Sequence, residues 1–233
     1  MKKLKPVVLS LGGSLLYENG LLRIRALREK ARAVARAARR SRAPLAVIVG
    51  GGAKSRAYAE DARQRGASEF EADEEAIRAT RENARVFAKT LFELGAHAVY
   101  CEDLHKAANL MQRGFIPVMG GQMPGLTTDA CAVLLAELTR AVRVVNASNV
   151  DGVYDRDPKL KGARRFARLS HEKLVAIAAA QDARRAGQHF IFDLLACKIA
   201  ARSKIRVEFV DGRDAERIEL ALEGKKHGGT IVA

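Results

Sequence analysis

A polar loop at residues 148–158 carries several groups that could bind a nucleotide. It follows a short apolar run, Ala141 to Val145, which is typical of a buried strand. Asn149 offers an amide, and Tyr154 offers a ring that could stack on a base. The loop also contains three carboxylates, Asp151, Asp155 and Asp157. Carboxylates could hold hydrated Mg²⁺ or bond ribose hydroxyl groups. Any single Asp is compatible with a solvated turn, but the whole string favours a ligand at the end of a strand.

Three other apolar runs end in glycine-rich segments. The segments are Gly12-Gly13-Ser14, Gly50-Gly51-Gly52 and residues 120–125. Glycine lets the backbone approach a ligand closely, and the N–H groups at a helix N-terminus point at anions. One such loop is weak evidence because glycine also marks plain turns. Several at strand ends in one chain favour a pair of phosphate-rich ligands.

Two common nucleotide-binding motifs are missing. The chain has no Gly-x-x-x-x-Gly-Lys-Ser/Thr, and no Gly-x-Gly-x-x-Gly follows its first strand. Basic residues nevertheless follow the loops, among them Lys54, Arg56 and Lys198. Phosphoryl transfer needs positioning and positive charge around the transferred group. Lys198 has apolar neighbours, so it is either a partly buried functional lysine or a surface lysine.

Strand and helix patterns alternate along the chain, which predicts a mostly parallel sheet with helices on both faces. Thr128 or Asp129 is the expected N-cap of the helix that follows the third glycine loop, and Ser170 that of a later one. The expected strands are residues 6–11, 45–49, 98–100, 116–119, 141–145, 205–209 and 230–232. The expected helices are residues 23–42, 54–65, 73–94, 104–112, 127–138, 170–180, 192–202 and 214–222.

Composition indicates a globular protein with a sizeable core. The chain has 233 residues, of which 48% are hydrophobic. No apolar run approaches the roughly 18 residues that a membrane span needs, and we expect neither a signal peptide nor a membrane partner. Cys101, Cys131 and Cys197 lie far apart, which suits reduced thiols in a cytoplasm better than disulfides or a zinc site.

The net charge of +14 and the pI of about 10.1 admit two interpretations. One is a polyanionic partner, either nucleic acid or a phosphorylated substrate. The other is a set of solvated helix faces. Much of the excess lies between Arg23 and Arg42, where Ile24, Leu27, Ala31 and Val34 share one helical face. Because no aromatic residues interleave with these arginines, we favour a solvated face over a nucleic-acid site.

The motifs together resemble the amino-acid kinase superfamily, and within it the archaeal type of uridylate (UMP) kinase most closely. The resemblance runs nearly end to end and in order. It rests on Gly12 to Ser14, Val49 to Gly52, Pro117 to Gly121, Gly125 to Ala130, Asn149 to Tyr154 with Asp157-Pro158, Ala200 to Ile205, and Gly229 to Ile231. The Thr-Thr-Asp-Ala and Asn-Val-Asp-Gly-Val-Tyr strings are specific to the superfamily.

The resemblance implies a three-layer α/β/α sandwich formed by a single domain, residues 1–233. The part up to about residue 125 would bind the acceptor, and the remainder would mainly bind ATP. The implied reaction transfers the γ-phosphoryl group of ATP, with Mg²⁺, to UMP and gives UDP for pyrimidine biosynthesis. Family relatives are hexamers built from dimers, and we expect a homo-oligomer here as well.

Site residues follow from the same resemblance, motif by motif. Gly13, Ser14, Gly52 and Arg56 would lie along the ATP phosphates. The adenosine part would be held by Ser148, Asn149, Tyr154 and Asp157. UMP would be held by Gly51, Asp73, Gln122, Met123, Pro124, Gly125, Leu126, Thr127 and Thr128. From its residue type alone, Asp73 could equally be a helix N-cap. Lys198 matches the family lysine near the phosphoryl groups, and Asp129 is our candidate for orienting cations there. No side chain is expected to be a dedicated metal ligand.

Two departures from the pattern bear on function. Many superfamily kinases carry a lysine two residues before the first glycine pair, and Ser10 stands there. Ser148 replaces the usual Thr before Asn149 and keeps the hydroxyl group. The isopentenyl phosphate kinase branch would carry a histidine beside the triple glycine, and Val49 and Ala53 stand there instead, which speaks against that branch. Two alternatives stay open: another small-molecule kinase of the superfamily, and a non-catalytic nucleotide-binding or storage protein on the same fold.

Overall fold

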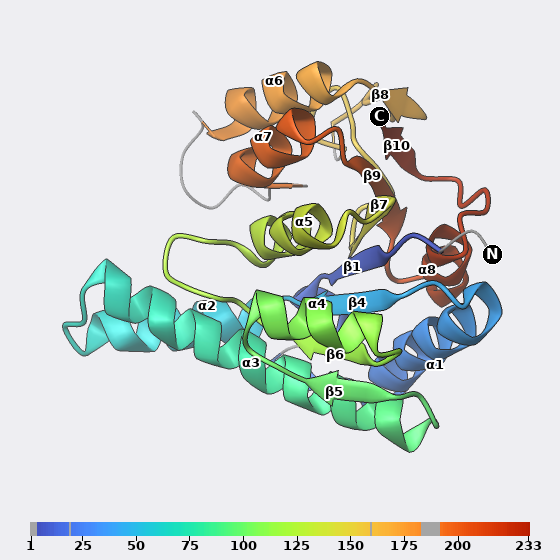
Figure 1. Cartoon of the computed structure of the whole chain (residues 1–233). Coiled ribbons are helices and arrows are strands. Elements are labelled where there is room, and N and C mark those ends of the chain that lie inside the picture. The colour runs from blue at the N-terminus through green and yellow to red at the C-terminus, as the bar shows by residue number, and fades with distance from the viewer. Residues whose placement is uncertain (1–3, 19, 159, 183–191) are drawn as a thin grey trace.

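The computed structural model describes residues 4–18, 20–158, 160–182 and 192–233. Its centre is an eight-stranded sheet in the order β5-β6-β4-β1-β7-β9-β10-β8, which Figure 1 shows from β5 at the bottom to β8 at the top. The strands are β5 (Ala98–Tyr100), β6 (Ile116–Met119), β4 (Leu45–Val49), β1 (Val7–Leu11), β7 (Arg143–Ser148), β9 (Arg206–Asp211), β10 (Thr230–Val232) and β8 (Arg168–Leu169). Only β10 and β8 run against the others, so the predicted mostly parallel sheet is confirmed.

Helices cover both faces of this sheet. All five residues of β1 and of β4 are buried, as expected for strands enclosed on two sides. Val8 belongs to one buried cluster and Leu9 to the other, because neighbouring side chains on a strand point to opposite faces. The first cluster packs under α4 (Leu104–Gln112), α5 (Thr128–Thr139), α6 (His171–Asp182) and α7 (Leu194–Arg202). The second packs under α1 (Ile24–Ser41), α3 (Glu69–Glu93) and α8 (Ala215–Leu222). The α/β/α sandwich is therefore confirmed.

The basic helix α1 uses part of its charge within the fold. Leu27, Ala31 and Val34 are buried as predicted, but Ile24 is 55% exposed at the start of the helix. On the outer side, Arg36 and Arg40 both bond the nearly buried carboxylate of Glu219 on α8. Two of the arginines therefore fasten α1 to α8.

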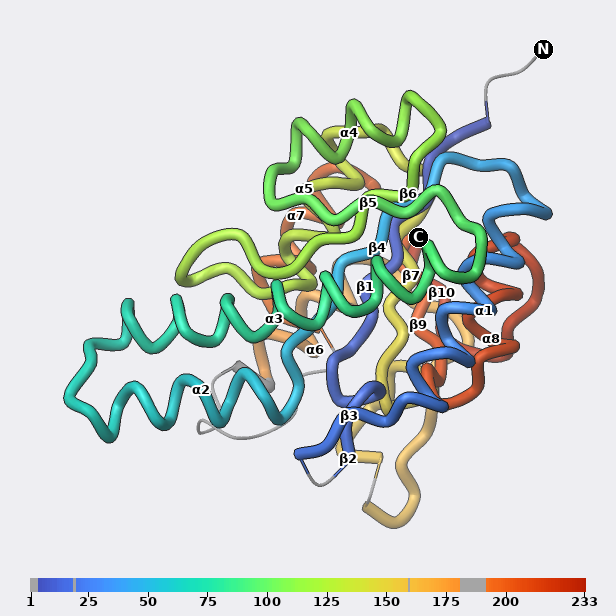
Figure 2. Tube along the Cα trace, turned by 90° about the horizontal axis from the view of Figure 1, so that it is seen from below, coloured from blue at the N-terminus to red at the C-terminus, as the bar shows by residue number. Residues whose placement is uncertain are grey.

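Helix α3 begins earlier than the sequence pattern predicted. Ser68 is its N-cap: its hydroxyl accepts a hydrogen bond from the N–H of Glu71, and the Glu71 carboxylate accepts one from the N–H of Ser68. This reciprocal pair stabilises the first turn and moves the start from residue 73 to Glu69. As Figures 1 and 2 show, α3 and α2 (Gly52–Gln64) form a hairpin that projects beyond the sheet.

Other differences involve caps and very short strands. Thr127, and not Thr128 or Asp129, caps α5, because its hydroxyl accepts the N–H of Ala130 at 3.0 Å. Ser170 does accept the N–H of Lys173, as predicted for a cap. The hairpin of β2 (Tyr17–Glu18) and β3 (Leu21–Leu22) and the strand β8 were not expected. A strand of two residues is too short for an alternation of apolar and polar side chains to be recognised in the sequence.

Sheet order brings the four ligand-binding candidates to one edge. The glycine loops and the 148–158 loop follow β1, β4, β6 and β7, and these strands are neighbours in the order β6-β4-β1-β7. All four are parallel, so their carboxyl ends meet at the same edge of the sheet. Segments that are far apart in sequence thereby become one surface.

Replacing Gly13 with Ala is expected to destabilise the fold. A Cβ atom there would lie 2.3 Å from the carbonyl oxygen of Gly50, so one of the two loops must move. We expect the free energy of unfolding in urea to fall by at least about 2 kcal/mol. Gly66→Ala is the control, because that glycine has a positive φ and open space around it; it should cost about 1 kcal/mol. Equal costs for the two variants would contradict the close contact.

Candidate active site

Two glycine loops pack backbone against backbone at the centre of the carboxyl edge. Cβ atoms built on Gly13 and Gly52 would each lie within 2.7 Å of the other loop's main chain. Gly52 also has φ +63°, a left-handed value that favours glycine. The ladders continue into these loops, since Gly12 N–H donates to Ala147 and Gly50 N–H donates to Leu11. A bound anion could therefore reach main-chain N–H groups without intervening side chains.

Side chains of α3 hold the loops that follow β4 and β6. Asn83 donates to the carbonyl oxygens of Gly50 and Gly51 at 2.9 and 3.3 Å. The Thr80 hydroxyl accepts the Gly121 N–H at 2.6 Å. Arg81 donates to the carbonyl oxygens of Gly121 and Gln122, at 3.2 and 3.1 Å. One helix thus fixes both loops.

Asp73 binds the predicted acceptor loop directly. Its carboxylate accepts the N–H of Gly125 at 3.0 Å, and it lies in the second turn of α3. The alternative role as an N-cap is therefore wrong, because Ser68 fills that position. The predicted acceptor residues on this loop are partly or fully open to solvent: Gln122, Met123, Pro124, Gly125, Leu126, Thr127 and Thr128.

Ser10 and Asp129 form a polar group in an otherwise apolar layer. The nearly buried Ser10 hydroxyl donates to Asp129 Oδ1 at 2.6 Å, and Asn146 Nδ2 donates to the same oxygen at 2.8 Å. Burial, with a smaller contribution from the charge of Asp193, raises the pKa of Asp129 to about 7. Within the described part of the chain, Asn146 Oδ1 is buried and accepts no hydrogen bond.

A second link joins the predicted acceptor loop, residues 122–128, to α7. The Thr127 hydroxyl donates to Asp193, whose other carboxylate oxygen caps α7 by accepting the N–H of Ala196. Lys198 follows on that helix. Its side chain is exposed, as expected of a surface lysine, while its neighbours Cys197 and Ile199 are buried.

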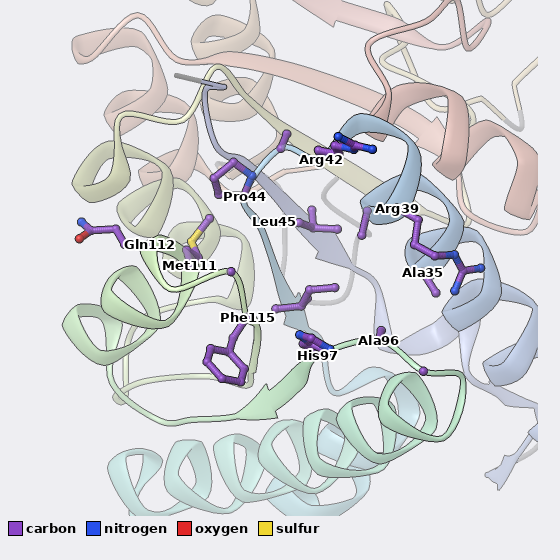
Figure 3. Close-up of a pocket in the computed structure, with 15 residues that line it drawn as sticks. Ala35, Arg39, Arg42, Pro44, Leu45, Ala96, His97, Met111, Gln112 and Phe115 are labelled. Atoms are coloured by element: carbon purple, nitrogen blue, oxygen red, sulfur yellow. The ribbon is translucent and has the colours of Figure 1, made fainter. Parts of the chain in front are cut away.

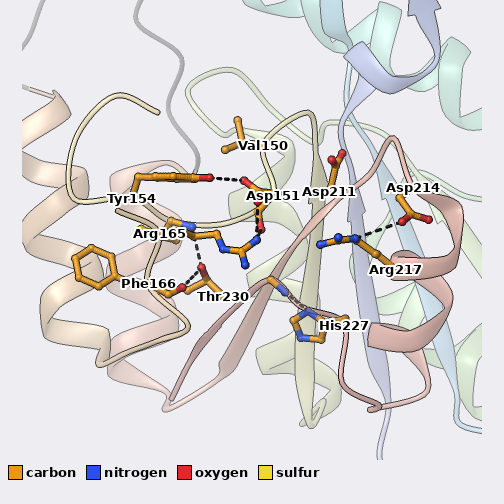
Figure 4. A network of polar contacts seen from close by, with 12 residues as sticks. Val150, Asp151, Tyr154, Arg165, Phe166, Asp211, Asp214, Arg217, His227 and Thr230 are labelled. Carbon is orange, nitrogen blue, oxygen red and sulfur yellow. Dashed lines mark hydrogen bonds and ion pairs between the residues drawn. The ribbon is translucent and has the colours of Figure 1, made fainter. Parts of the chain in front are cut away.

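The loop after β7 is braced by its own carboxylates. Figure 4 shows the Tyr154 hydroxyl donating to Asp151, which also pairs with Arg165 at 2.5 Å. Asp155 accepts the Arg164 N–H and pairs with Arg156. These two carboxylates therefore orient the loop and the Tyr154 ring. Asn149 and Asp157 are exposed, and Ser148 is half-buried beside Gly12.

The cations that follow the triple glycine differ in their contacts. Lys54 forms an ion pair with Glu82 at 2.6 Å. Arg56 is exposed, and no partner is found for it in the described ranges. Ser14 is likewise exposed, in a short 3₁₀ turn directly after Gly13. Arg56 and Ser14 are therefore available to a ligand.

The structure brings some predicted residues together and leaves others apart. Five of them meet where the loops touch: Gly13, Gly51, Gly52, Ser148 and Thr128. Asp73 accepts a hydrogen bond from Gly125 of the neighbouring loop. Among the described residues, no hydrogen bond or ion pair joins the side chain of Lys198 or Tyr154 to the glycine loops. Sequence reasoning missed Asp193, Arg165 and the contacts of Asn83. The Asp-Leu-Leu start of α7 was a readable cap signal for Asp193.

A cavity of about 410 Å³ lies elsewhere, and Figure 3 shows it between α1, α4 and the strand starts. Leu45, Ile116 and His97 line it, so it lies at the amino ends of β4, β6 and β5. Helices α1, α3 and α4 all end there, and their carbonyl ends disfavour anions. The phosphate-binding candidates are at the opposite edge.

The fold and the site define a three-layer α/β/α protein whose glycine loops gather at one sheet edge. The chain belongs to the amino acid kinase family, whose model matches residues 5–211. It is 39% identical over 227 residues to "Uridylate kinase" of Haloquadratum walsbyi, covering 97% of this chain and 92% of that one. With "Uridylate kinase" of Archaeoglobus fulgidus it shares 40% over 228 residues, covering 97% and 99%. A crystal structure of the Archaeoglobus enzyme superposes with a TM-score of 0.85 at 39% identity, covering 99% of this chain and 100% of that one.

Replacing Asp129 with Asn should alter how stability depends on pH. The carboxyl pKa is about 7 in the fold against 3.8 for the free group, so the folded state binds more protons between these values. The contribution of the Asp129 carboxyl to the free energy of unfolding is therefore fully present below about pH 4 and is lost as the pH rises through 7. The Asn side chain keeps an oxygen that can accept the Ser10 hydroxyl, but it does not titrate in this pH range.

Urea titrations from pH 4 to 8 test this prediction. The wild type should lose on the order of 3–4 kcal/mol relative to Asp129→Asn across that range, at about 1.4 kcal/mol for each unit of pKa difference. Asp61→Asn is the control, because Asp61 is an exposed residue on α2 that pairs with Arg65 at the surface. A constant difference between wild type and Asp129→Asn would show that Asp129 does not take up a proton in the fold.

Proposed function

We propose that this protein is a nucleoside monophosphate kinase that transfers the γ-phosphoryl group of ATP to UMP. The observation that carries the proposal is the near full-length identity of about 40% to proteins named uridylate kinase, on a chain whose four loops converge at one sheet edge. The reaction needs no general base, because the acceptor is already an anionic phosphate oxygen. Positioning and charge stabilisation are what the protein must supply.

The site suits two nucleotides that meet at their phosphates. Main-chain N–H groups of Gly13 and Gly52, with Ser14 and Arg56 beside them, would face the ATP phosphates. Ser148, Asn149, Tyr154 and Asp157 would hold adenosine, with the Tyr154 ring braced by Asp151. Gly51, Asp73 and residues 122–128 would hold UMP. The Asp73 to Gly125 hydrogen bond supports this grouping, because it keeps the helix and the loop together.

Magnesium fits the oxygen ligands near Ser10. The free oxygen of Asp129 and the buried, unpartnered Asn146 Oδ1 are hard donors of the kind Mg²⁺ prefers. No group of three or more His, Cys, Asp or Glu side chains suited to a metal occurs among the described residues, so ATP phosphates would supply the other ligands. When bound, Mg²⁺ would neutralise charge on the transferred phosphoryl group. Ser10 keeps the Asp129 carboxyl in place and adds no positive charge.

We extend the proposal to the setting of the enzyme. Cys101, Cys131 and Cys197 are free and buried thiols, which suits a cytoplasm. None of the described helices is long and apolar enough to cross a bilayer. The homo-oligomer, a hexamer built from dimers, stays a prediction, as does the place in pyrimidine biosynthesis.

A coupled ADP-release assay with MgATP tests the proposal against a panel of acceptors. The panel is UMP, CMP, dTMP, isopentenyl phosphate and several amino acids. We expect strong turnover with UMP alone. Turnover with another acceptor would retain the kinase and discard the UMP assignments of Asp73 and residues 122–128. ATP binding without any turnover would support the non-catalytic alternative.

Replacing Lys198 with Ala should reduce kcat by about 100-fold or more, because an ammonium group near the transferred phosphoryl stabilises its charge. The matched control is Arg202→Ala on the same helix, where Arg202 pairs with Glu137 away from the loops. Steady-state kinetics with UMP measure both variants. Wild-type kcat in Lys198→Ala would remove Lys198 from the mechanism.

A further inference from the structure

The side-chain amide of Asn83 is held in one orientation by three hydrogen bonds. Asn83 is 2% exposed in the middle of α3. Its Nδ2 group donates to the carbonyl oxygens of Gly50 and Gly51, and its Oδ1 accepts the Tyr17 hydroxyl at 2.6 Å. A buried amide with both N–H bonds and its oxygen paired cannot turn over without losing all of them.

This orientation determines where two backbone N–H groups point. In a planar trans peptide the C=O and N–H bonds point in opposite directions. The carbonyl of Gly50 shares its peptide with the N–H of Gly51, and that of Gly51 shares its peptide with the N–H of Gly52. Because Asn83 draws both carbonyl oxygens toward α3, both N–H groups face away from the helix. Within the described residues, neither N–H donates to a protein acceptor outside a helix.

The backbone around these N–H groups has the shape of an anion-binding nest. Gly51 is right-handed, with φ −86° and ψ −34°, and Gly52 has φ +63°. Successive residues of opposite hand turn their N–H groups into one concave surface. The surface lies against Gly13 of the first glycine loop, and α2 begins at Gly52. Charge that develops on a transferred phosphoryl group is what such fixed dipoles stabilise.

We propose that Asn83, locked by Tyr17, is a positioning residue that aims the N–H groups of Gly51 and Gly52 at the phosphoryl group during its transfer. The proposal rests on the proposed kinase function. Asn83 itself touches no substrate. It acts by holding the nest, and Tyr17 links that nest to the β2–β3 hairpin.

Steady-state kinetics of Asn83→Ala, Asn83→Asp and Tyr17→Phe test this role. A misdirected donor pair should stabilise the transition state less, so kcat of Asn83→Ala should fall about 10- to 100-fold, while KM for UMP and for ATP changes less than about threefold. Tyr17→Phe, which keeps the ring, should give a smaller loss of kcat. Thr90→Ala is the matched control, because Thr90 is buried on the same helix and its hydroxyl donates to the Val86 carbonyl within that helix.

The pH profile of Asn83→Asp separates positioning from a general loss of structure. An ionised carboxylate would repel the carbonyl oxygens of Gly50 and Gly51, whereas the protonated acid can donate to one of them. The ratio of variant to wild-type kcat should therefore rise as pH falls from 8 to 5. A flat ratio in a folded variant would contradict the proposal.

Thermal unfolding of each variant accompanies the kinetics, and Tyr17→Phe keeps the test open if an Asn83 variant does not fold. Wild type that fails to phosphorylate UMP would refute the proposed acceptor, and the variants would then be compared on whichever acceptor turns over. Active wild type with unchanged kcat in folded Asn83→Ala would refute the positioning role alone.

Discussion

The site depends on a contact that only glycine permits. Gly13 and Gly52 bring the main chains that follow β1 and β4 to a separation with no room for a Cβ atom on either. The two strands are hydrogen-bonded neighbours, so their loops leave the sheet side by side. That closeness leaves main-chain N–H groups of two loops exposed to one ligand. The hydrophobic burial of β1 and β4 on both faces stabilises the strands that hold the contact.

Helix α3 connects this contact to the loop that follows β6. Asn83 fixes the loop after β4, Thr80 and Arg81 fix the loop after β6, and Asp73 reaches Gly125. Asp73, Thr80 and Asn83 recur at helical spacing, so they share one side of the helix, and Arg81 follows directly after Thr80. A single rigid element therefore sets the distance between the loops predicted to bind donor phosphates and those predicted to bind the acceptor. At the other end of the acceptor loop, Thr127 and Asp193 join it to α7.

Most of the fold could be predicted because long apolar runs and periodic helices carry a strong signal. The bounds of β4, β5, β6, α4 and β10 were predicted to the residue. The start of α3 was missed because Asp73 drew attention as a cap, although Ser68 and Glu71 form a readable capping pair. The glycine motifs predicted loops that the structure places together at the carboxyl ends of neighbouring strands. The contacts of Asn83 and Arg165 join segments distant in sequence, and no local pattern encodes them.

The charge of the protein is also easier to interpret with the fold in view. Arg36 and Arg40 bond Glu219, and Arg81 bonds loop carbonyl oxygens, so part of the basic excess holds the structure together. At the site, Ser10 leaves the region around Asp129 without a lysine. Lys198, Arg56 and a divalent cation are the sources of positive charge that we propose for phosphoryl transfer.

A crystal structure with UMP and a non-hydrolysable ATP analogue would test the account most directly. We predict the analogue's phosphates over the N–H groups of Gly13 and Gly52, its base against Tyr154, and UMP held by Gly51, Asp73 and residues 122–128. Nucleotides bound at the opposite edge, or phosphates that bypass the glycine contact, would contradict it.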